Sequence, residues 1–373
     1  MENKYQEKYM HRAIELAESG RGKTSPNPMV GAVIVKNNRI VGEGFHKAAG
    51  QPHAEPEALR EAGENAAGST LYVNLEPCSH HGRTPPCAPA IADAGITRVV
   101  AGMKDPNPEV SGRGFEILEQ RDVEVITGVL EEECLRLNEA FVKVMKTGLP
   151  FITLKAAASL DGKIATASGH SKWISSEESR ETVHVMRGES DAVLVGLGTL
   201  LTDNPKLTSR LPEDRKIKDP LRVAFDPRLE IPVDSNFVNM AGDGKTVLIT
   251  LENANTEKAE QLQEKGCSII RVPEDKKGHP DAAEAMKKLA GRGVNSVLLE
   301  GGGELSFSML QSGLIDRIVV FYAPVLIGGR NAKTFLEGEG FPSIPDSLRV
   351  NNIAILKNDS GDIVLTADIS SQQ

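Results

Sequence analysis

The sequence lacks several features that secreted, membrane-spanning or nucleic-acid-binding proteins need. Its 373 residues include only 4 cysteines, too few for a disulfide framework. Its apolar runs have the length of strands and fall well short of the roughly 20 residues that cross a bilayer. Its net charge of −9 is the opposite of the basic excess typical of general nucleic-acid binding. We therefore expect neither a membrane nor a nucleic acid as a partner.

The composition is otherwise that of an ordinary folded protein, with 39% hydrophobic and 25% charged residues. A length of 373 residues exceeds one typical core and predicts two domains. Residues 1–20 predict a charged amphipathic helix without the apolar centre of a signal peptide, so we expect a cytoplasmic protein.

Strand-like and helix-like segments alternate through the first part of the chain. MVGAVIV and RIVGEGF flank KNN, which predicts a β-hairpin. Helices are expected at 53–63, 87–95 and 114–122, strands at 69–77, 98–103 and 123–129, and a single last helix at 131–145. This order predicts an α/β domain with a mixed sheet.

The segment KTGLP, at residues 146–150, is the expected joint between the domains, which places them at 1–147 and 148–373. A second α/β series follows the joint. It includes a strand that runs into Ser159, a long strand over 317–329 and a final hairpin about residues 359–361. Thr199, Asp203 and Arg210 are expected in a polar loop.

The first domain contains a candidate metal site. His53 and Glu55 begin one expected helix, Cys78 follows a strand, and Cys87 begins the next helix. One histidine and two thiolates form a soft ligand set that favours zinc. Three protein ligands leave a position for water, as in catalytic zinc sites, and Glu55 is free to move a proton. The pattern matches the H-x-E…P-C signature of zinc nucleobase deaminases, with eight residues between the cysteines instead of two.

Other interpretations of this pattern exist. His80 or His81 would complete a structural site with two cysteines and two histidines, which leaves Glu55 without a role. The long loop that carries His80 and Arg83 would instead line a catalytic site and contact a charged substrate.

Three more side chains are candidates for substrate contact in this domain. Asn27 precedes the hairpin, where an amide suits the polar edge of a pyrimidine. Asp105 and Asn107 follow a strand in the segment DPNP. Asp-Pro and Asn-Pro also form ordinary turns, so these three positions have a purely structural alternative.

The second domain offers a glycine-rich turn in LEGGGEL, between a strand and a helix that starts near Glu304. Such a turn suits a phosphate group at a helix N-terminus, although a tight turn alone also explains it. Trp173, the only tryptophan, lies in a loop where it either packs or flanks a cofactor. Arg187 and Arg210 are candidate anchors for a substrate phosphate.

Together these segments resemble the bifunctional deaminase and reductase family of riboflavin biosynthesis. HAE, NLEPCSHHGRTPPC and DPNP resemble its deaminase half, and LKAAASLDGKIA, SKWIS, LTDNPKLTSR and LEGGGEL resemble its reductase half. The resemblance covers nearly the whole chain. It implies a cytidine deaminase-like domain, then a dihydrofolate reductase-like α/β domain, which act in succession on phosphoribosyl pyrimidines. It also implies Zn2+ and NADPH as cofactors. We further expect a homo-oligomer.

The resemblance further implies roles for individual residues. His53, Cys78 and Cys87 correspond to zinc ligands, and Glu55 corresponds to the proton shuttle. The implied cofactor positions are Ala157, Trp173, Thr199, Asp203, Gly302, Gly303, Glu304, Leu305, Ser306, Phe307 and Ser308. The implied substrate positions of the reductase are Ser171, Arg187, Leu207, Arg210 and Glu300. Pro56 and Glu57 stand where many relatives are expected to have Val and His, and Pro227 replaces a small hydroxyl residue.

Two rival functions fit parts of the sequence. A nucleoside or tRNA deaminase fused to a binding module would share the metal motif, but the acidic balance argues against tRNA. A non-enzymatic scaffold stabilised by zinc would use the same metal ligands, but Glu55 would have no function in it.

Overall fold

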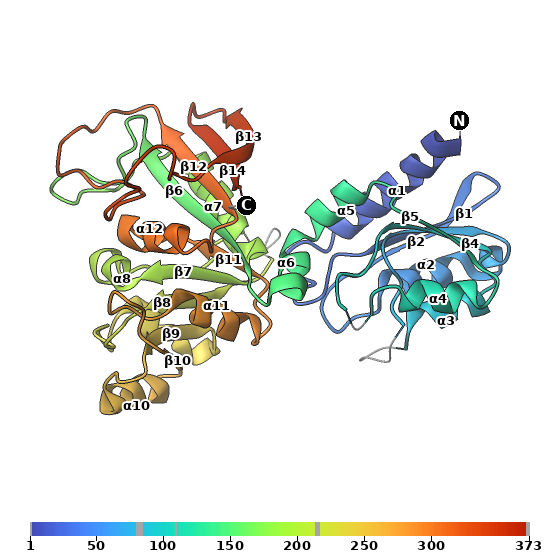
Figure 1. The fold of residues 1–373 in the computed structure, drawn as a ribbon, viewed down its shortest axis with the longest axis horizontal. Helices are drawn as coiled ribbons and strands as arrows, with labels where there is room; N and C mark the ends of the chain where they lie inside the picture. The colour runs from blue at the N-terminus through green and yellow to red at the C-terminus, as the bar shows by residue number, and fades with distance from the viewer. Residues whose placement is uncertain (1, 80–84, 109, 213–216, 371–373) are drawn as a thin grey trace. The chain divides into compact units, whose positions relative to one another are not determined.

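The computed structural model describes residues 2–79, 85–108, 110–212 and 217–370, with side chains from residue 7 onward. The chain divides into two units, Met1–Gly148 and Leu149–Gln373, which Figure 1 colours from blue to red along the sequence. Among the described residues, no helix combines the length and the hydropathy needed to cross a bilayer.

Unit 1 is an α/β layer structure around a five-stranded sheet of order β2-β1-β3-β4-β5. Its elements are α1 (Glu2–Glu18), β1 (Gly31–Lys36), β2 (Arg39–Phe45), α2 (Ala54–Ala62), β3 (Thr70–Leu75), α3 (Cys87–Asp93), β4 (Arg98–Met103), α4 (Arg113–Glu119), β5 (Glu124–Thr127), α5 (Glu131–Leu137) and α6 (Glu139–Thr147). β1 pairs antiparallel with β2 and β3, and β3, β4 and β5 run parallel. The expected hairpin and mixed sheet are confirmed.

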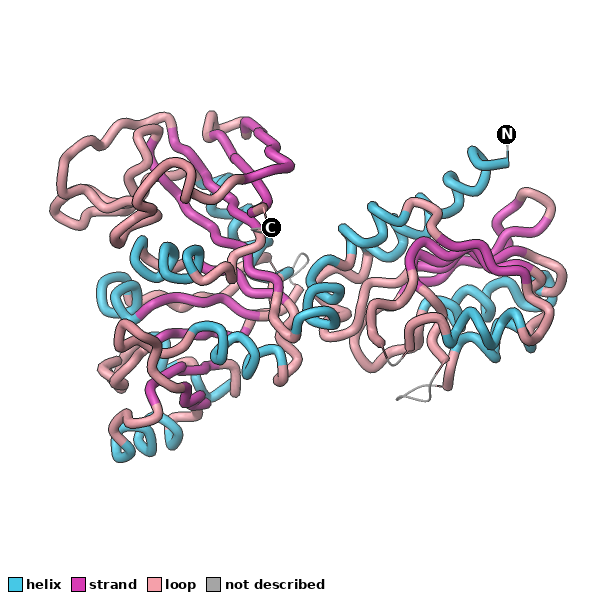
Figure 2. Tube along the Cα trace, viewed as in Figure 1, coloured by secondary structure: helices cyan, strands magenta, loops and turns pink. Residues whose placement is uncertain are grey.

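The hairpin turn follows from two asparagines. Asn37 and Asn38 both have positive φ angles, of 52° and 60°, as the tight turn of a two-residue hairpin requires. The sheet is covered on both faces (Figures 1 and 2). One apolar cluster joins the sheet to α2, α3 and α4, and a second joins it to α1 and α5.

The last helix of unit 1 is not continuous, so the prediction of a single helix over 131–145 is wrong. The chain leaves the helical conformation at Asn138, whose φ is −108° and ψ is 22°. The Asn138 amide accepts a hydrogen bond from the Met29 backbone N–H at 2.8 Å and donates one to the Met29 carbonyl at 2.9 Å. These long-range bonds outweigh the local helical preference. The break therefore ties α5 and α6 to the segment before β1.

Unit 2 contains a nine-stranded sheet of order β10-β9-β8-β7-β11-β6-β12-β14-β13. Its strands are β6 (Phe151–Ser159), β7 (Ala192–Gly196), β8 (Leu221–Phe225), β9 (Thr246–Leu251), β10 (Ser268–Val272), β11 (Ser296–Leu299), β12 (Arg317–Ala323), β13 (Val350–Lys357) and β14 (Ile363–Ile369). Its helices are α7 (Glu177–Glu189), α8 (Leu197–Asp203), α9 (Asn236–Asn239), α10 (Thr256–Glu264), α11 (Ala282–Ala290) and α12 (Gly303–Gln311).

The strands from β10 to β12 are parallel, and β14 and β13 add an antiparallel hairpin at one edge, as expected for residues 359–361. α11 and α12 pack on one face of the sheet, and α8, α9 and α10 pack on the other. The apolar strands are thus buried on both faces, as in other parallel sheets.

Two local predictions for unit 2 need correction. The strand expected over 317–329 ends at Ala323, because Pro324 has no N–H for the sheet. Thr199 and Asp203 lie in the short helix α8 and not in a loop. The helix begins directly after β7, with Gly196 at its N-cap position.

Candidate active sites

The first site forms where α2 begins. Gly42 and Gly44 in β2 let this helix lie directly on the strand, since a Cβ at these positions would come within 2.3 Å of the Ala58 carbonyl and 2.4 Å of the Ala54 carbonyl. The close packing fixes the helix start, and His53 occupies its N-cap position.

His53, Cys78 and Cys87 come together as a candidate metal centre. Their ligand atoms all lie within 4.8 Å of one another. The His53 Nδ1 atom is 3.6 Å from the Cys78 sulfur and 3.4 Å from the Cys87 sulfur. Tetrahedral zinc with ordinary bond lengths separates nitrogen and sulfur ligands by about 3.5 Å. The three residues therefore fit zinc in both chemistry and spacing.

The thiols lie in a polarising environment. The backbone N–H of Cys87 donates to the Cys78 sulfur at 3.3 Å. Hydrogen bonds from the Cys87 thiol and the His53 ring lower the pKa of Cys78 to about 4, and the pairing with Cys78 raises the pKa of Cys87. The centre thus favours thiolate at Cys78, which is the form that binds a metal.

Glu55 lies beside this centre and is 3% exposed. Its Oε2 atom is buried and has no hydrogen-bond partner among the described residues. Burial, followed by the negative charge of Cys78, raises the pKa of Glu55 to about 7. A buried carboxylate oxygen without a partner is costly for the fold, which is typical of a group kept for catalysis.

A cavity of about 540 Å³ opens onto these residues. Its wall includes Asn27, Asp105 and Asn107, so the structure brings the three weaker candidates to the same cavity as Glu55. His80 and Arg83 lie outside the described residues.

His46 is a cavity residue that the sequence did not reveal. Its Nδ1 atom is 3.0 Å from the Pro52 carbonyl, so this nitrogen carries the proton. Its Nε2 atom then accepts a hydrogen bond from the Asn27 amide at 3.1 Å. A lone histidine seven residues before His53 gives no signal in the sequence, because its partners come from other loops.

The second site is a cavity of about 310 Å³ in unit 2. Most of the predicted reductase residues line it, namely Ala157, Ser171, Trp173, Arg187, Thr199, Asp203, Arg210, Glu300 and Gly302. The other predicted residues, Leu207 and residues 303–308, are described by the structure but do not line this cavity. Leu207 packs in the core, and residues 303–308 form the first turns of α12 behind Gly302.

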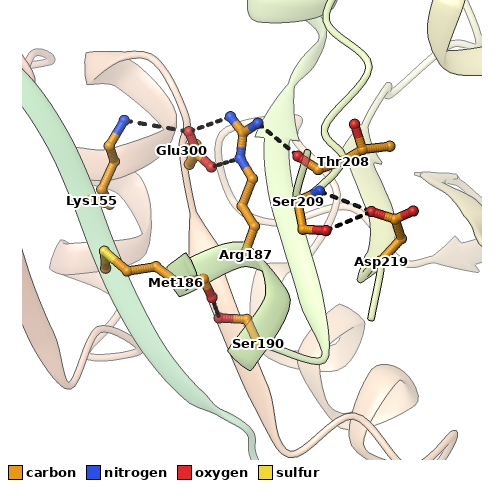
Figure 3. A network of polar contacts seen from close by, with 8 residues as sticks. All are labelled: Lys155, Met186, Arg187, Ser190, Thr208, Ser209, Asp219 and Glu300. Carbon is orange, nitrogen blue, oxygen red and sulfur yellow. Dashed lines mark hydrogen bonds and ion pairs between the residues drawn. The ribbon is translucent and has the colours of Figure 1, made fainter. Parts of the chain in front are cut away.

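Glu300 is the centre of a buried ion-pair network in this cavity (Figure 3). The Arg187 guanidinium donates from Nε at 2.6 Å and from Nη2 at 2.9 Å to its two oxygens. Lys155 contributes its Nζ atom at 3.4 Å. Burial opposes ionisation, but the charges of Arg187 and Lys155 outweigh it and lower the pKa of Glu300 to about 2.

The remaining nitrogen of the Arg187 guanidinium also has a partner, since Nη1 donates to the Thr208 carbonyl at 3.2 Å. The guanidinium of Arg187 is therefore occupied by Glu300 and Thr208. Of the two arginines predicted to bind a substrate phosphate, Arg210, which also lines the cavity, is the better candidate. Burial, followed by the charges of Arg210 and Arg187, lowers the pKa of His184 in the same wall to about 4. Lys155 and His184 were both missed, because a lysine in a strand and a histidine in a helix carry no motif.

Comparisons with known proteins identify both units. Residues 3–103 match the cytidine and deoxycytidylate deaminase zinc-binding region, and residues 150–364 match the RibD C-terminal domain. The chain is 45% identical to the riboflavin biosynthesis protein RibD of Bacillus amyloliquefaciens, over 91% of this chain and 90% of that protein. It is 44% identical to RibD of Escherichia coli, over 86% and 88% of the two chains. A solved structure of Acinetobacter baumannii RibD superposes with a TM-score of 0.90 at 36% identity, over 99% of this chain and 100% of that chain.

The fold, the two sites and these matches define a bifunctional enzyme, with a zinc-binding deaminase domain followed by a reductase domain. The chain belongs to the RibD family of riboflavin biosynthesis proteins. The cofactors of this family are zinc in the deaminase and NADPH in the reductase. The α/β fold class and the bifunctional activity expected from the sequence are thereby confirmed.

Proposed function

We propose that unit 1 deaminates 2,5-diamino-6-(5-phosphoribosylamino)pyrimidin-4-one and that unit 2 reduces the ribosyl group of the product, 5-amino-6-(5-phosphoribosylamino)uracil, to ribityl. A Thermotoga maritima structure with 36% identity and a TM-score of 0.84 carries the name diaminohydroxyphosphoribosylaminopyrimidine deaminase/5-amino-6-(5-phosphoribosylamino)uracil reductase. We assign the deamination to residues 1–147 and the reduction to residues 148–373.

One observation carries the deaminase assignment. The buried Oε2 atom of Glu55 has no hydrogen-bond partner within the described ranges. It lies beside a His/Cys/Cys set that fits zinc, at a cavity large enough for a small heterocycle. When bound, zinc makes a water molecule acidic enough to act as a nucleophile at neutral pH.

The residues of the chain perform the remaining steps. His53, Cys78 and Cys87 hold the metal, and Glu55 takes a proton from the attacking water and gives it to the leaving nitrogen. Water adds to the amine-bearing ring carbon, the carbon–nitrogen bond breaks, and ammonia leaves. Asn27, which His46 holds in one orientation, lies where it can bind the polar edge of the pyrimidine. Asp105 and Asn107 line the same cavity.

The deaminase proposal is tested by metal content together with ammonia release. Wild-type protein should contain one zinc per chain and release ammonia from the diaminopyrimidine without NADPH. Cys87→Ala should lose both. Zinc-loaded wild-type protein that releases no ammonia would refute the deaminase proposal.

For the reductase, we propose that Trp173, Thr199, Asp203 and Gly302 contribute to the binding of NADPH. When bound, NADPH supplies the hydride for C1′ of the open imine form of the sugar. Arg210 and Ser171 lie in the wall where they can bind the anionic substrate, and Glu300 presents its carboxylate, held by Arg187 and Lys155, to the cavity.

The lone tryptophan gives a direct test of the cofactor site. Trp173 is 70% exposed and lines the cavity, and it is the only tryptophan in the chain. NADPH should therefore quench nearly all the tryptophan emission in a saturable titration. Unchanged Trp173 emission at NADPH concentrations that support turnover would refute the assignment.

We also propose that the protein is a cytoplasmic homo-oligomer. β13 is an edge strand of the sheet in unit 2. Its side chains Ile353, Ile355 and Leu356 are 59%, 64% and 69% exposed. Long apolar edge strands favour pairing with another chain, which supports an interface between copies at this edge.

A further inference from the structure

Glu76 is a buried carboxylate to which neither the motifs nor the proposed chemistry assigns a role. It directly follows β3, is 3% exposed and borders the deaminase cavity. Its backbone N–H donates to the Met103 carbonyl at 3.0 Å, which fixes the residue to the end of β4.

Both oxygens of this carboxylate accept hydrogen bonds from backbone N–H groups, Oε2 from the segment between β4 and α4 and Oε1 from the first turn of α4. Oε2 accepts from Asp105 at 3.1 Å and from Gly112 at 3.0 Å. Oε1 accepts from Gly114 at 3.0 Å. Hydrogen bonds to a charged acceptor are about twice as strong as neutral ones, so one side chain holds both ends of this segment.

The same contacts hold the first turn of α4 against a metal ligand. A Cβ at Gly114 would lie 2.0 Å from the Pro77 carbonyl and 3.2 Å from the Glu76 Oε1 atom. Only glycine permits this approach, and Pro77 is followed directly by Cys78. The substrate side and the metal side of the cavity therefore meet at Glu76.

The segment that Glu76 holds carries two side chains of the cavity wall. Asp105 and Asn107 both line the cavity, and the Asn107 N–H donates to the Asp105 Oδ1 atom at 2.8 Å. This local bond sets the conformation of the turn, but it does not fix the position of the turn relative to the metal centre. The bonds that Glu76 accepts from Asp105, Gly112 and Gly114 fix that position.

We propose that Glu76 is a positioning residue of the deaminase, which holds Asp105 and Asn107 at a set distance from the metal centre so that they bind the pyrimidine substrate. The inference rests on the proposed deaminase function and deepens it. Glu76 acts through these residues and does not itself take part in proton transfer.

Glu76→Gln is the sharpest test, because the side chain keeps its length. One oxygen replaces two, so the amide cannot accept from Asp105, Gly112 and Gly114 together, and its NH2 group faces an N–H donor. We expect zinc content and cooperative unfolding to be retained, and KM for the diaminopyrimidine to rise about 10- to 100-fold with a smaller change in kcat. Reduction of the deaminated product by the same protein should be unchanged.

Glu61→Gln is the matched control. The Glu61 Oε2 atom also accepts from a backbone N–H, that of Glu43 at 2.9 Å, but Glu61 is not part of the described cavity wall. This control should have wild-type KM. Wild-type KM in Glu76→Gln, or loss of zinc together with activity, would overturn the proposal.

A double-mutant cycle with Asn107→Ala separates positioning from general stability. If Glu76 acts through this segment, the effects of Glu76→Gln and Asn107→Ala on KM should be less than multiplicative. Multiplicative effects would overturn the proposal.

Hydrogen exchange without substrate gives an independent readout. The backbone amides of Asp105, Gly112 and Gly114 should exchange faster in Glu76→Gln than in the wild type, and unchanged exchange would also overturn the proposal. Failure of the proposed function is distinct, since wild-type protein would then release no ammonia.

Discussion

At the residue scale, our proposal assigns metal binding and proton transfer to different residues of the deaminase site. His53 and Glu55 are two residues apart, yet His53 contacts both cysteines, while the buried Oε2 atom of Glu55 has no partner in the part of the chain that the structure describes. A ligand set with one spare carboxylate suits hydrolysis, where a proton must move from water to the leaving group.

Glu55→Gln should therefore keep zinc and lose deamination by about 10²- to 10⁴-fold, the usual contribution of a general acid–base group. Metal analysis and ammonia release check the two halves of this prediction. Glu57→Gln is the control, since Glu57 pairs with Lys47 and Arg60 at the surface of the same helix. A purely structural zinc site predicts equal activities for the two variants.

Glu300 gives a prediction about pH and stability in unit 2. Its pKa falls from the ordinary 4.5 to about 2 in the folded state, so its ion pairs add stability above the unfolded value. That stability is lost as the pH falls from about 4.5 toward about 2. At neutral pH, Glu300→Gln should destabilise unit 2 by about 3–5 kcal/mol, because buried Arg187 loses its partner.

Urea unfolding of the wild type and Glu300→Gln across this pH range is the measurement. The difference between the two unfolding free energies should shrink as the pH drops below 4.5. A difference that stays constant down to pH 3 would mean that the ionised carboxylate of Glu300 is not the source of the stabilisation.

At the scale of elements, the break between α5 and α6 shows where a local pattern fails. The Asn138 amide satisfies both backbone groups of Met29. Asn138→Leu should leave the Met29 N–H without this bond and remove one of the two bonds to the Met29 carbonyl, which Asn74 also donates to at 2.9 Å. We expect unit 1 to be destabilised by about 2 kcal/mol. Chemical denaturation followed by helical circular dichroism checks this. Asn236→Leu, at the half-buried start of α9 in unit 2, is the control and should leave the stability of unit 1 unchanged.

The elements and the metal motif could largely be predicted from the sequence, because strand and helix periodicities and ligand spacing are local. His46, Glu76 and Lys155 could not, since their partners Asn27, Gly114 and Glu300 lie far away in the chain. The same reason explains the break at Asn138, which depends on Met29.

At the scale of the whole molecule, the exposed edge strand predicts assembly. Ile355→Lys places a charge in the middle of β13 and should shift the oligomer toward monomer, as measured by light scattering. Ile40→Lys is the control, since Ile40 is 42% exposed in β2 of the other unit. Equal masses for wild type and Ile355→Lys would exclude this edge as the interface.

One chain carries two sites, and we propose that they act in order. The most direct measurement follows ammonia release and NADPH oxidation together, in wild type and in Glu55→Gln. Wild type should release ammonia first and then oxidise NADPH. Glu55→Gln should do neither with the diaminopyrimidine, but should oxidise NADPH normally with the deaminated uracil compound. NADPH oxidation by Glu55→Gln directly from the diaminopyrimidine would show that reduction does not depend on prior deamination.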